Sequence, residues 1–160
     1  MKPPFFLLAF LLTFGGCTQN SHHADHTASA ESEAAIASDT LCFQRYSGLS
    51  NQDTASVKLI IDGNNVTGQY TNLPHEKDGR FGSISGIKAG HLIKGIWRYQ
   101  QEGMDDSIGF EFKLHDDKLL QKNTSFDMNI GREFLSDTAS FSLKYVKIAC
   151  ETVDFPARRN

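Results

Sequence analysis

The feature that most constrains the fold of this chain is an alternation of apolar and polar residues with a period of two. Its clearest example is the run SIGFEFKL, residues 107–114, in which every second side chain is apolar: Ile108, Phe110, Phe112 and Leu114. Successive side chains of a β-strand point to opposite faces of a sheet, so this pattern predicts a strand with one buried face. No segment has a convincing helical period, and residues 130–136 are the best candidate for a short helical turn. The sequence therefore predicts an all-β domain.

About eight such strands are expected, joined into successive antiparallel hairpins by turn signals such as DGN at residues 62–64. They cover residues 40–47, 57–61, 66–70, 82–87, 91–100, 107–114, 118–127 and 139–150. In the last strand the apolar phase shifts after Tyr145, which predicts a β-bulge there. An open meander would leave two exposed edges. Closure into a small up-and-down barrel, calycin- or lipocalin-like in form, removes them.

Three cysteines occur, one near the start of the chain and two at the ends of the predicted barrel. Cys42 lies in the first expected strand and Cys150 at the end of the last one. An even pair of cysteines in an exported protein favours a disulfide, and closure of the barrel would bring those two strands together. Two free buried thiols are the alternative. The chain has no C-x-x-C motif, so nothing indicates a redox or metal role for this pair.

Residues 1–16 have the layout of a secretory signal peptide. Lys2 precedes an apolar run, residues 5–14, that is about as long as a signal-peptide core and too short to span a bilayer as a helix. The tetrapeptide FGGC that ends at Cys17 resembles the lipobox of bacterial lipoproteins, although Leu is commoner than Phe at its first position. The resemblance implies cleavage before Cys17 and its modification by diacylglycerol and an acyl chain such as palmitate. Because Thr18 stands where Asp would favour the inner membrane, it also implies the outer membrane. An ordinary secretory signal with an incidental cysteine is the alternative.

Residues 17–38 are almost all small or polar, and such a composition cannot bury enough apolar surface to fold. We therefore expect a disordered tether between the lipid and the barrel. The tether contains the sequence HHADH, which supplies four candidate metal ligands: His22, His23, Asp25 and His26. Their imidazoles and carboxylate suit zinc, copper or nickel. A flexible segment fixes no coordination geometry. Metal capture near the membrane and a soluble spacer that contains histidine are therefore both open.

Charge and motif content argue against several classes of function. The chain has 16 basic and 19 acidic residues, and removal of residues 1–16 takes away only Lys2, which leaves 15 basic residues and a formal charge of −4. A general nucleic-acid binder carries a basic surface instead. No Gly-x-Ser-x-Gly nucleophile elbow and no phosphate-binding glycine loop occurs. We therefore expect no enzymatic activity and no cofactor.

Two sets of polar residues could form a site if the fold brings their members together. The first consists of carboxylates that flank the expected hairpin at residues 82–100: Glu76, Asp78 and Glu102. They could form an acid–base or calcium site, or ion pairs that organise the rim of the barrel. The second set consists of three histidines: His75, His91 and His115. They could bind zinc if they converge, although scattered surface histidines are the commoner arrangement.

One stretch resembles part of a known family. It is NLPHEKDGRFGSISGIKAGHLIKGIWRYQQEG, residues 72–103, together with Cys42-Phe43 in the first expected strand. The stretch resembles small bacterial lipoproteins of uncharacterised function. These share an early Cys-Tyr/Phe strand, a Glu-Lys-Asp near a Gly-rich strand and a Glu-Gly that closes the next strand. The resemblance covers roughly half of the domain and implies an exported lipoprotein with a calycin-like barrel. It implies no particular activity.

The sequence thus predicts a signal peptide at residues 1–16, a lipidated cysteine and tether at residues 17–38, a β-barrel at residues 39–155 and a tail at residues 156–160. We expect a non-enzymatic, membrane-anchored envelope protein that binds a small apolar or amphipathic ligand, or an envelope partner, and no nucleic acid. Neighbouring predicted strands contain four aromatic residues: Trp97, Tyr99, Phe110 and Phe112. They could line the ligand pocket, or they could form only the barrel core. The alternatives are a structural or stress-related envelope interaction protein with a filled barrel, and metal capture by the tether.

Overall fold

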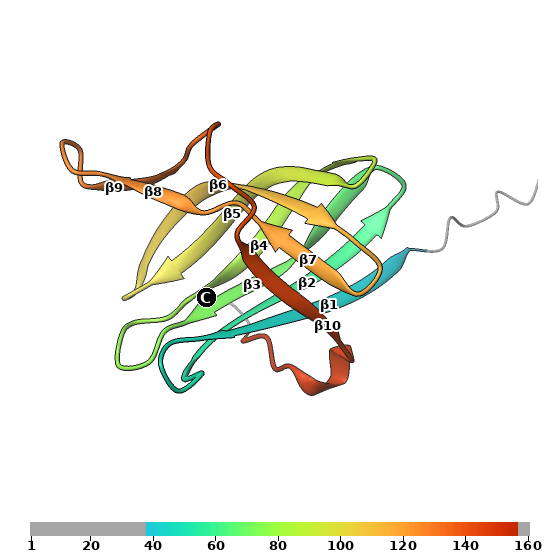
Figure 1. The fold of residues 1–160 in the computed structure, drawn as a ribbon, viewed down its shortest axis with the longest axis horizontal. Helices are drawn as coiled ribbons and strands as arrows, with labels where there is room; N and C mark the ends of the chain where they lie inside the picture. Colours follow the sequence, from blue (N-terminus) through green and yellow to red (C-terminus); the bar gives the residue numbers. More distant parts are fainter. Residues whose placement is uncertain (1–37, 157–160) are drawn as a thin grey trace, which may run out of the picture. The chain divides into compact units, whose positions relative to one another are not determined.

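Eight strands close into an antiparallel barrel in the computed structural model, which describes residues 38–156 (Figure 1). In chain order the barrel strands are β1 (Asp39–Ser47), β2 (Asp53–Asp62), β3 (Asn65–Leu73), β4 (Arg80–Ala89), β5 (Leu92–Gln101), β6 (Met104–Leu114), β7 (Lys118–Gln121) and β10 (Leu143–Ile148). Around the barrel they follow the order β1-β10-β7-β6-β5-β4-β3-β2, so the first and last strands are neighbours. The predicted all-β fold with a closed antiparallel barrel is confirmed.

The two ends of the barrel carry different connections. One end, which we call the hairpin end, carries the β1–β2, β3–β4 and β5–β6 connections together with a two-stranded sheet of β8 (Thr124–Asp127) and β9 (Arg132–Leu135). The opposite end carries the β2–β3, β4–β5 and β6–β7 turns, and β1 begins there at Asp39. Figure 1 shows the β8–β9 hairpin projecting away from the barrel on the side opposite to the start of β1.

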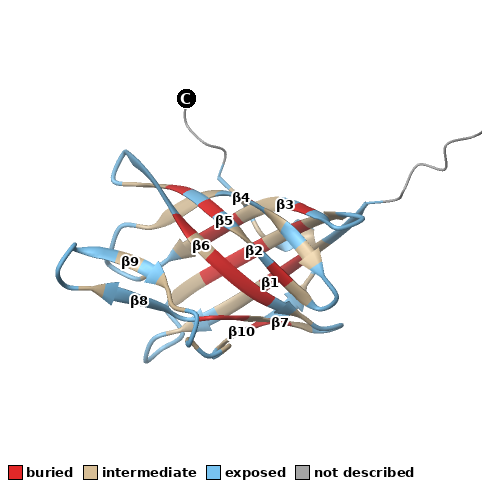
Figure 2. Cartoon of the chain, turned by 90° about the horizontal axis from the view of Figure 1, so that it is seen from above, coloured by how far each residue is buried: buried red, intermediate tan, exposed pale blue. Residues whose placement is uncertain are grey.

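The alternating apolar side chains fill the barrel interior. Ile108, Phe110 and Phe112 of β6 are buried, and Figure 2 shows buried residues along the other barrel strands, whereas β8 and β9 are largely exposed. The core consists mainly of branched aliphatic and aromatic side chains, among them Phe43, Val57, Leu59, Tyr70, Ile84, Ile93, Trp97, Leu119 and Tyr145. Glycine permits the close approach of two strands, because a Cβ on Gly95 of β5 would collide with the Ser85 carbonyl oxygen of β4.

The prediction of one continuous strand at residues 118–127 is wrong, because this segment forms two separate strands. Its first half is β7, but the chain leaves the barrel after Gln121, and its second half is β8, which pairs with β9. At the break, the Lys122 ammonium lies 3.0 Å from the Glu111 carboxylate on β6. The alternation of apolar residues carries no information about this ion pair. The sequence pattern therefore does not show that the chain leaves the barrel after Gln121.

The helical turn predicted at residues 130–136 is also wrong, because Arg132–Leu135 is the strand β9. A tight turn joins β8 to β9. The Asp127 carboxylate accepts a 2.8 Å hydrogen bond from the Asn129 backbone N–H, which is a side-chain-stabilised turn. Gly131 takes a φ of 68°, a left-handed conformation that glycine adopts without strain. The residues that suggested a helical turn therefore form a hairpin.

The β-bulge predicted near Tyr145 is wrong as well. β10 pairs with its two neighbours in continuous register, and Val146 lies opposite both Lys118 of β7 and Gln44 of β1. Tyr145 is fully buried, whereas Val146 is 51% exposed. A bulge would have turned Val146 and Ile148 toward the barrel interior. Without it, both lie on the outer face of the barrel. The strand ends at Ile148, earlier than the sequence predicts.

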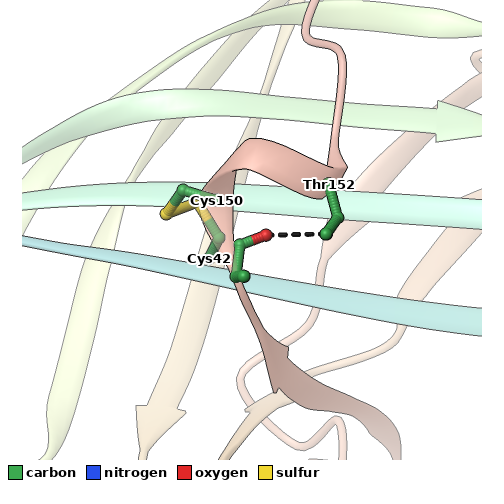
Figure 3. Close-up of a disulfide and its surroundings, with 4 residues drawn as sticks. Cys42, Cys150 and Thr152 are labelled. Carbon is green, nitrogen blue, oxygen red and sulfur yellow. Dashed lines mark hydrogen bonds between the residues drawn. A yellow bond between two sulfur atoms is a disulfide. The ribbon is translucent and has the colours of Figure 1, made fainter.

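The predicted disulfide between Cys42 and Cys150 is confirmed, with 5.1 Å between the two Cα atoms. Cys42 precedes the core residue Phe43 in β1 and so points to the outer face of the barrel. Cys150 begins a 3-10 turn, Cys150–Thr152, in which the Thr152 hydroxyl donates a 2.7 Å hydrogen bond to the Ala149 carbonyl (Figure 3). The bridge lies beside the β1–β10 seam, which has three aligned residue pairs, against nine between β1 and β2.

Candidate functional site at the hairpin end of the barrel

The four aromatic residues predicted to line a pocket all lie inside the barrel. Trp97 and Tyr99 of β5 and Phe110 and Phe112 of β6 are at most 7% exposed. Tyr70 of β3 packs against them, and its ring centroid lies 4.1 Å from that of Trp97. Phe112 is fully buried in the packed core, whereas Trp97, Tyr99 and Phe110 also border open spaces at the hairpin end. Those spaces, not the middle of the barrel, are the candidate site.

A buried hydrogen-bond network forms part of the wall of the first of these spaces. The Tyr145 hydroxyl donates to Gln121 Oε1 at 2.6 Å, and the Tyr70 hydroxyl donates to the same oxygen at 3.1 Å. The two hydroxyl oxygens are 2.9 Å apart. Burial raises the pKa of Tyr70 and raises that of Tyr145 further, so both hydroxyls stay protonated and act as donors.

This first space, which we call the inner cavity, has a volume of about 120 Å³. Barrel strands and the hairpin both contribute to its wall, whose polar members include Arg45, Arg80, Trp97, Gln121 and Glu133. Trp97 Nε1 and Arg45 Nε are buried and have no hydrogen-bond partner within residues 38–156. Unpartnered buried donors are rare in folded proteins, so these two atoms distinguish the inner cavity from the rest of the core.

The second space, which we call the outer cleft, has a volume of about 360 Å³ and lies between the β5–β6 connection and the β8–β9 hairpin. Its apolar surface comes from Tyr99, Met104 and Phe126, and the last two are 68% and 55% exposed. Its polar lining includes six charged residues, Arg80, Glu102, Asp105, Asp106, Arg132 and Glu133. The outer cleft therefore has an apolar part and a charged part side by side.

Two ion pairs hold the hairpin against the barrel. Arg80 Nη1 donates to Glu133 Oε2 at 2.7 Å, and Arg132 Nη2 donates to Asp106 Oδ1 at 2.6 Å. Burial acts to lower the pKa of Arg80, but the Glu133 carboxylate outweighs that effect and raises it, so the guanidinium stays charged. The guanidinium also lies 5.0 Å from the Tyr99 ring centroid. Burial raises the pKa of Tyr99, with nearby carboxylates adding to the rise and Arg80 opposing it.

A separate ionic cluster fixes the chain that leads into the hairpin. Glu111, on the outer face of β6, is 7% exposed and lies 3.0 Å from the ammonium groups of both Lys94 and Lys122. Lys122 also donates to the Asp137 carbonyl at 3.1 Å. Burial opposes ionisation of Glu111, but its hydrogen bonds to the two lysines outweigh this and lower its pKa. The cluster borders neither the inner cavity nor the outer cleft, so its role is structural.

The fold does not bring the three predicted carboxylates into one site. Glu102 borders the outer cleft, whereas Asp78 borders a different hollow beside Lys77. Glu76 lies in the β3–β4 connection, where its carboxylate is 3.9 Å from His75 Nδ1. Each of these carboxylates thus has separate surroundings at the rim.

The three predicted histidines do not converge either. His91 and His115 stack at the opposite end of the barrel, with ring centroids 6.1 Å apart. His75 lies at the hairpin end, where its backbone N–H donates to the Asp53 carboxylate. Within residues 38–156, no three His, Cys, Asp or Glu side chains are placed to hold a metal ion together.

Several sequence predictions fall on residues 1–37, which lie outside the described part of the chain. They are the signal peptide, the lipidation of Cys17 and the metal ligands His22, His23, Asp25 and His26. In the described part, residues 38–156, no helix has the length and apolar character needed to cross a membrane.

The sequence predictions missed Arg45 and the pairing of Arg80 with Glu133 at the hairpin end. Arg45 and Arg80 occupy inward-facing positions of β1 and β4, two residues away from Phe43 and Gly82 on the same faces. A charged residue in phase with a buried face is unusual, and that signal was present in the sequence. Glu133 has no comparable signal, because its partner Arg80 is 53 positions away.

No family model matches the chain, and no curated protein or solved structure matches it.

Proposed function

We propose that this protein is a lipid-anchored protein of the bacterial cell envelope, in the outer membrane, that binds a small amphipathic ligand and catalyses no reaction. The lipobox-like FGGC ending at Cys17 supports the anchor. The outer cleft is the observation that carries the binding role, because a hollow of about 360 Å³ with apolar and charged walls lies at the hairpin end.

The size and the lining of the outer cleft favour an amphipathic ligand. Ligand sites in proteins commonly have volumes of roughly 300–1,000 Å³ and combine apolar walls with a few placed polar groups. Tyr99, Met104 and Phe126 supply apolar surface, and Arg80 and Arg132 supply charge. The volume is at the low end of the range, so the ligand is small. A purely apolar ligand would match only the apolar part of this wall, whereas an amphipathic ligand can also contact its charged part.

The position and chemistry of the outer cleft also support binding without catalysis. β1 begins at the end of the barrel away from the hairpin, so the anchored segment joins the barrel far from the cleft (Figure 1). Two of the four cleft carboxylates, Asp106 and Glu133, already accept hydrogen bonds from Arg132 and Arg80. These contacts favour a role in holding the hairpin over proton transfer to a substrate.

Native mass spectrometry of the protein purified from its own host tests this proposal. The wild-type protein should carry a bound small molecule, and Phe126→Asp should lose it, because a carboxylate would replace the apolar wall of the outer cleft. Leu49→Asp is the matched control, since Leu49 is fully exposed in the β1–β2 loop and does not line the cleft. It should retain the ligand.

Two results would contradict the proposal. A wild-type protein without any bound molecule would favour the alternative of an envelope interaction protein with a filled barrel. Equal retention by Phe126→Asp and Leu49→Asp would place the ligand elsewhere.

A further inference from the structure

We propose that the inner cavity is a binding site for a carboxylate group, with Arg45, Trp97 and Gln121 as its hydrogen-bond donors. The carboxylate could belong to a free small anion or to the head group of the ligand in the outer cleft, and only in the second case does the inference rest on the proposed function.

The inner cavity is surrounded by more hydrogen-bond donors than acceptors can satisfy. Trp97 is 4% exposed, and its Nε1 has no hydrogen-bond partner in the described part of the chain. The same holds for Arg45 Nε. Gln121 also lines the cavity, and because its Oε1 accepts from two tyrosines, its amide Nε2 is the group that could donate to a ligand. A bound group that accepts several hydrogen bonds would satisfy all three side chains.

The wall of the inner cavity carries a positive charge, that of Arg45, without a negative partner in the described residues. The ionisable groups on the cavity wall, apart from tyrosine, are Arg45, Arg80 and Glu133. Arg80 and Glu133 form an ion pair and neutralise each other. Arg45 forms no ion pair within residues 38–156, and its guanidinium lies 5.6 Å from the Tyr145 ring centroid. A partly buried guanidinium without a counter-ion attracts an anion.

The volume of the inner cavity and the shape of the Arg45 guanidinium also suit a carboxylate group. A cavity of about 120 Å³ has the volume of about four water molecules at roughly 30 Å³ each. This volume is sufficient for a carboxylate group. The planar guanidinium of Arg45 matches a carboxylate through two parallel hydrogen bonds.

The inner cavity also adjoins the outer cleft. Arg80 and Glu133 border both spaces. The Glu133 carboxylate accepts a 2.7 Å hydrogen bond from Arg80, so a carboxylate and a guanidinium already pair where the two spaces meet. A ligand with a carboxylate head could therefore place the head in the inner cavity and its apolar part in the outer cleft.

The experiment uses Trp97 as the reporter, because it is the only tryptophan of the chain. The mature chain, with Cys17→Ser to keep it soluble, is titrated at constant pH and ionic strength with acetate, acetamide, hexanoate and hexanamide. Binding is followed through the indole N–H resonance and the fluorescence of Trp97. Acetate and hexanoate should shift both signals, and their uncharged amides should bind at least about tenfold more weakly. Tighter binding of hexanoate than of acetate would identify the head group of an amphipathic ligand, and equal binding a free small carboxylate.

Three variants test the assigned residues. Arg45→Gln should weaken acetate binding about tenfold or more, because it removes a charge-assisted hydrogen bond. Arg98→Gln is the matched control, since Arg98 faces outward on β5 and borders neither the inner cavity nor the outer cleft, and it should bind acetate like the wild type. Glu133→Gln should bind acetate more tightly, because it removes the only carboxylate from the cavity wall.

Several outcomes would overturn the inference. Hexanamide bound as tightly as hexanoate would refute a carboxylate site and leave the proposed amphipathic ligand in place. A Trp97 signal that responds to none of the four probes would refute the site altogether. Equal binding by Arg45→Gln and Arg98→Gln would remove Arg45 from it. If Arg45→Gln fails to fold, the comparison of each carboxylate with its amide in the wild-type chain decides.

Discussion

The double substitution Cys42→Ala/Cys150→Ala should remove a large share of the stability of the barrel. The disulfide spans a sequence separation of 108 residues, and the chain-entropy model gives about 5 kcal/mol for a loop of this length. A single domain is stable by only about 5–15 kcal/mol in total. The β1–β10 seam offers little compensation, because its three aligned residue pairs are few compared with the nine between β1 and β2.

The assay is urea unfolding followed by the fluorescence of Trp97, with Cys17→Ser in both proteins so that the third cysteine cannot form other disulfides. We expect a loss of about 3–5 kcal/mol and a larger m-value, because the unfolded chain without the bridge exposes more surface. Hydrogen exchange should become faster at Val146 and Ile148 in the seam, and also at the slowest-exchanging amides of the other barrel strands, because the free energy of global unfolding falls.

Two results would refute this reasoning. A loss below about 1 kcal/mol, no larger than that of an average substitution, would mean that strand pairing alone closes the barrel. Unchanged exchange at Val146 and Ile148 would mean that the bridge does not stabilise the β1–β10 seam.

Other predictions concern the ionic cluster, the buried network and the anchor. Glu111→Gln should destabilise the barrel by about 3 kcal/mol in thermal or urea unfolding, because it leaves the buried Lys122 ammonium without its counter-ion. The pKa of Glu111 is lowered by folding, so its contribution is complete above its unfolded-state pKa and is lost as the pH falls through its folded-state pKa. The wild type and the variant should therefore converge in stability in acid, and a difference that widened would contradict the assignment. Tyr145→Phe should cost about 1–2 kcal/mol, since it removes a buried hydrogen bond to Gln121, and unchanged stability would show that the network is dispensable. Cys17→Ser should move the protein from the membrane fraction to the soluble fraction, and continued membrane residence would contradict lipidation.

The barrel can be predicted from the sequence because its signal is local and repeated. In SIGFEFKL each apolar residue marks an inward position, and the structure buries Ile108, Phe110 and Phe112 as expected. The same pattern misleads in the segment after β7. There Phe126, Met128 and Ile130 alternate like core residues, yet they are 55%, 84% and 67% exposed. Alternation indicates a strand, but it does not indicate whether another sheet covers its apolar face.

The candidate site is less predictable because its parts come from distant strands. Trp97 and Phe110 could be identified as interior residues from alternation alone. The pairing of Arg80 with Glu133 depends on a hairpin that folds back over the end of the barrel, across 53 positions of sequence. Arg45 is intermediate, since its inward phase is readable but its lack of a counter-ion within the described residues depends on the closed barrel.

A crystal structure of the protein purified from its own host would test most directly the claim that binding occurs at the hairpin end and not in the packed core. We expect ligand density in the outer cleft, against Tyr99, Met104 and Phe126. Density between Phe112 and Leu119 in the core, or an outer cleft without any ligand, would contradict it.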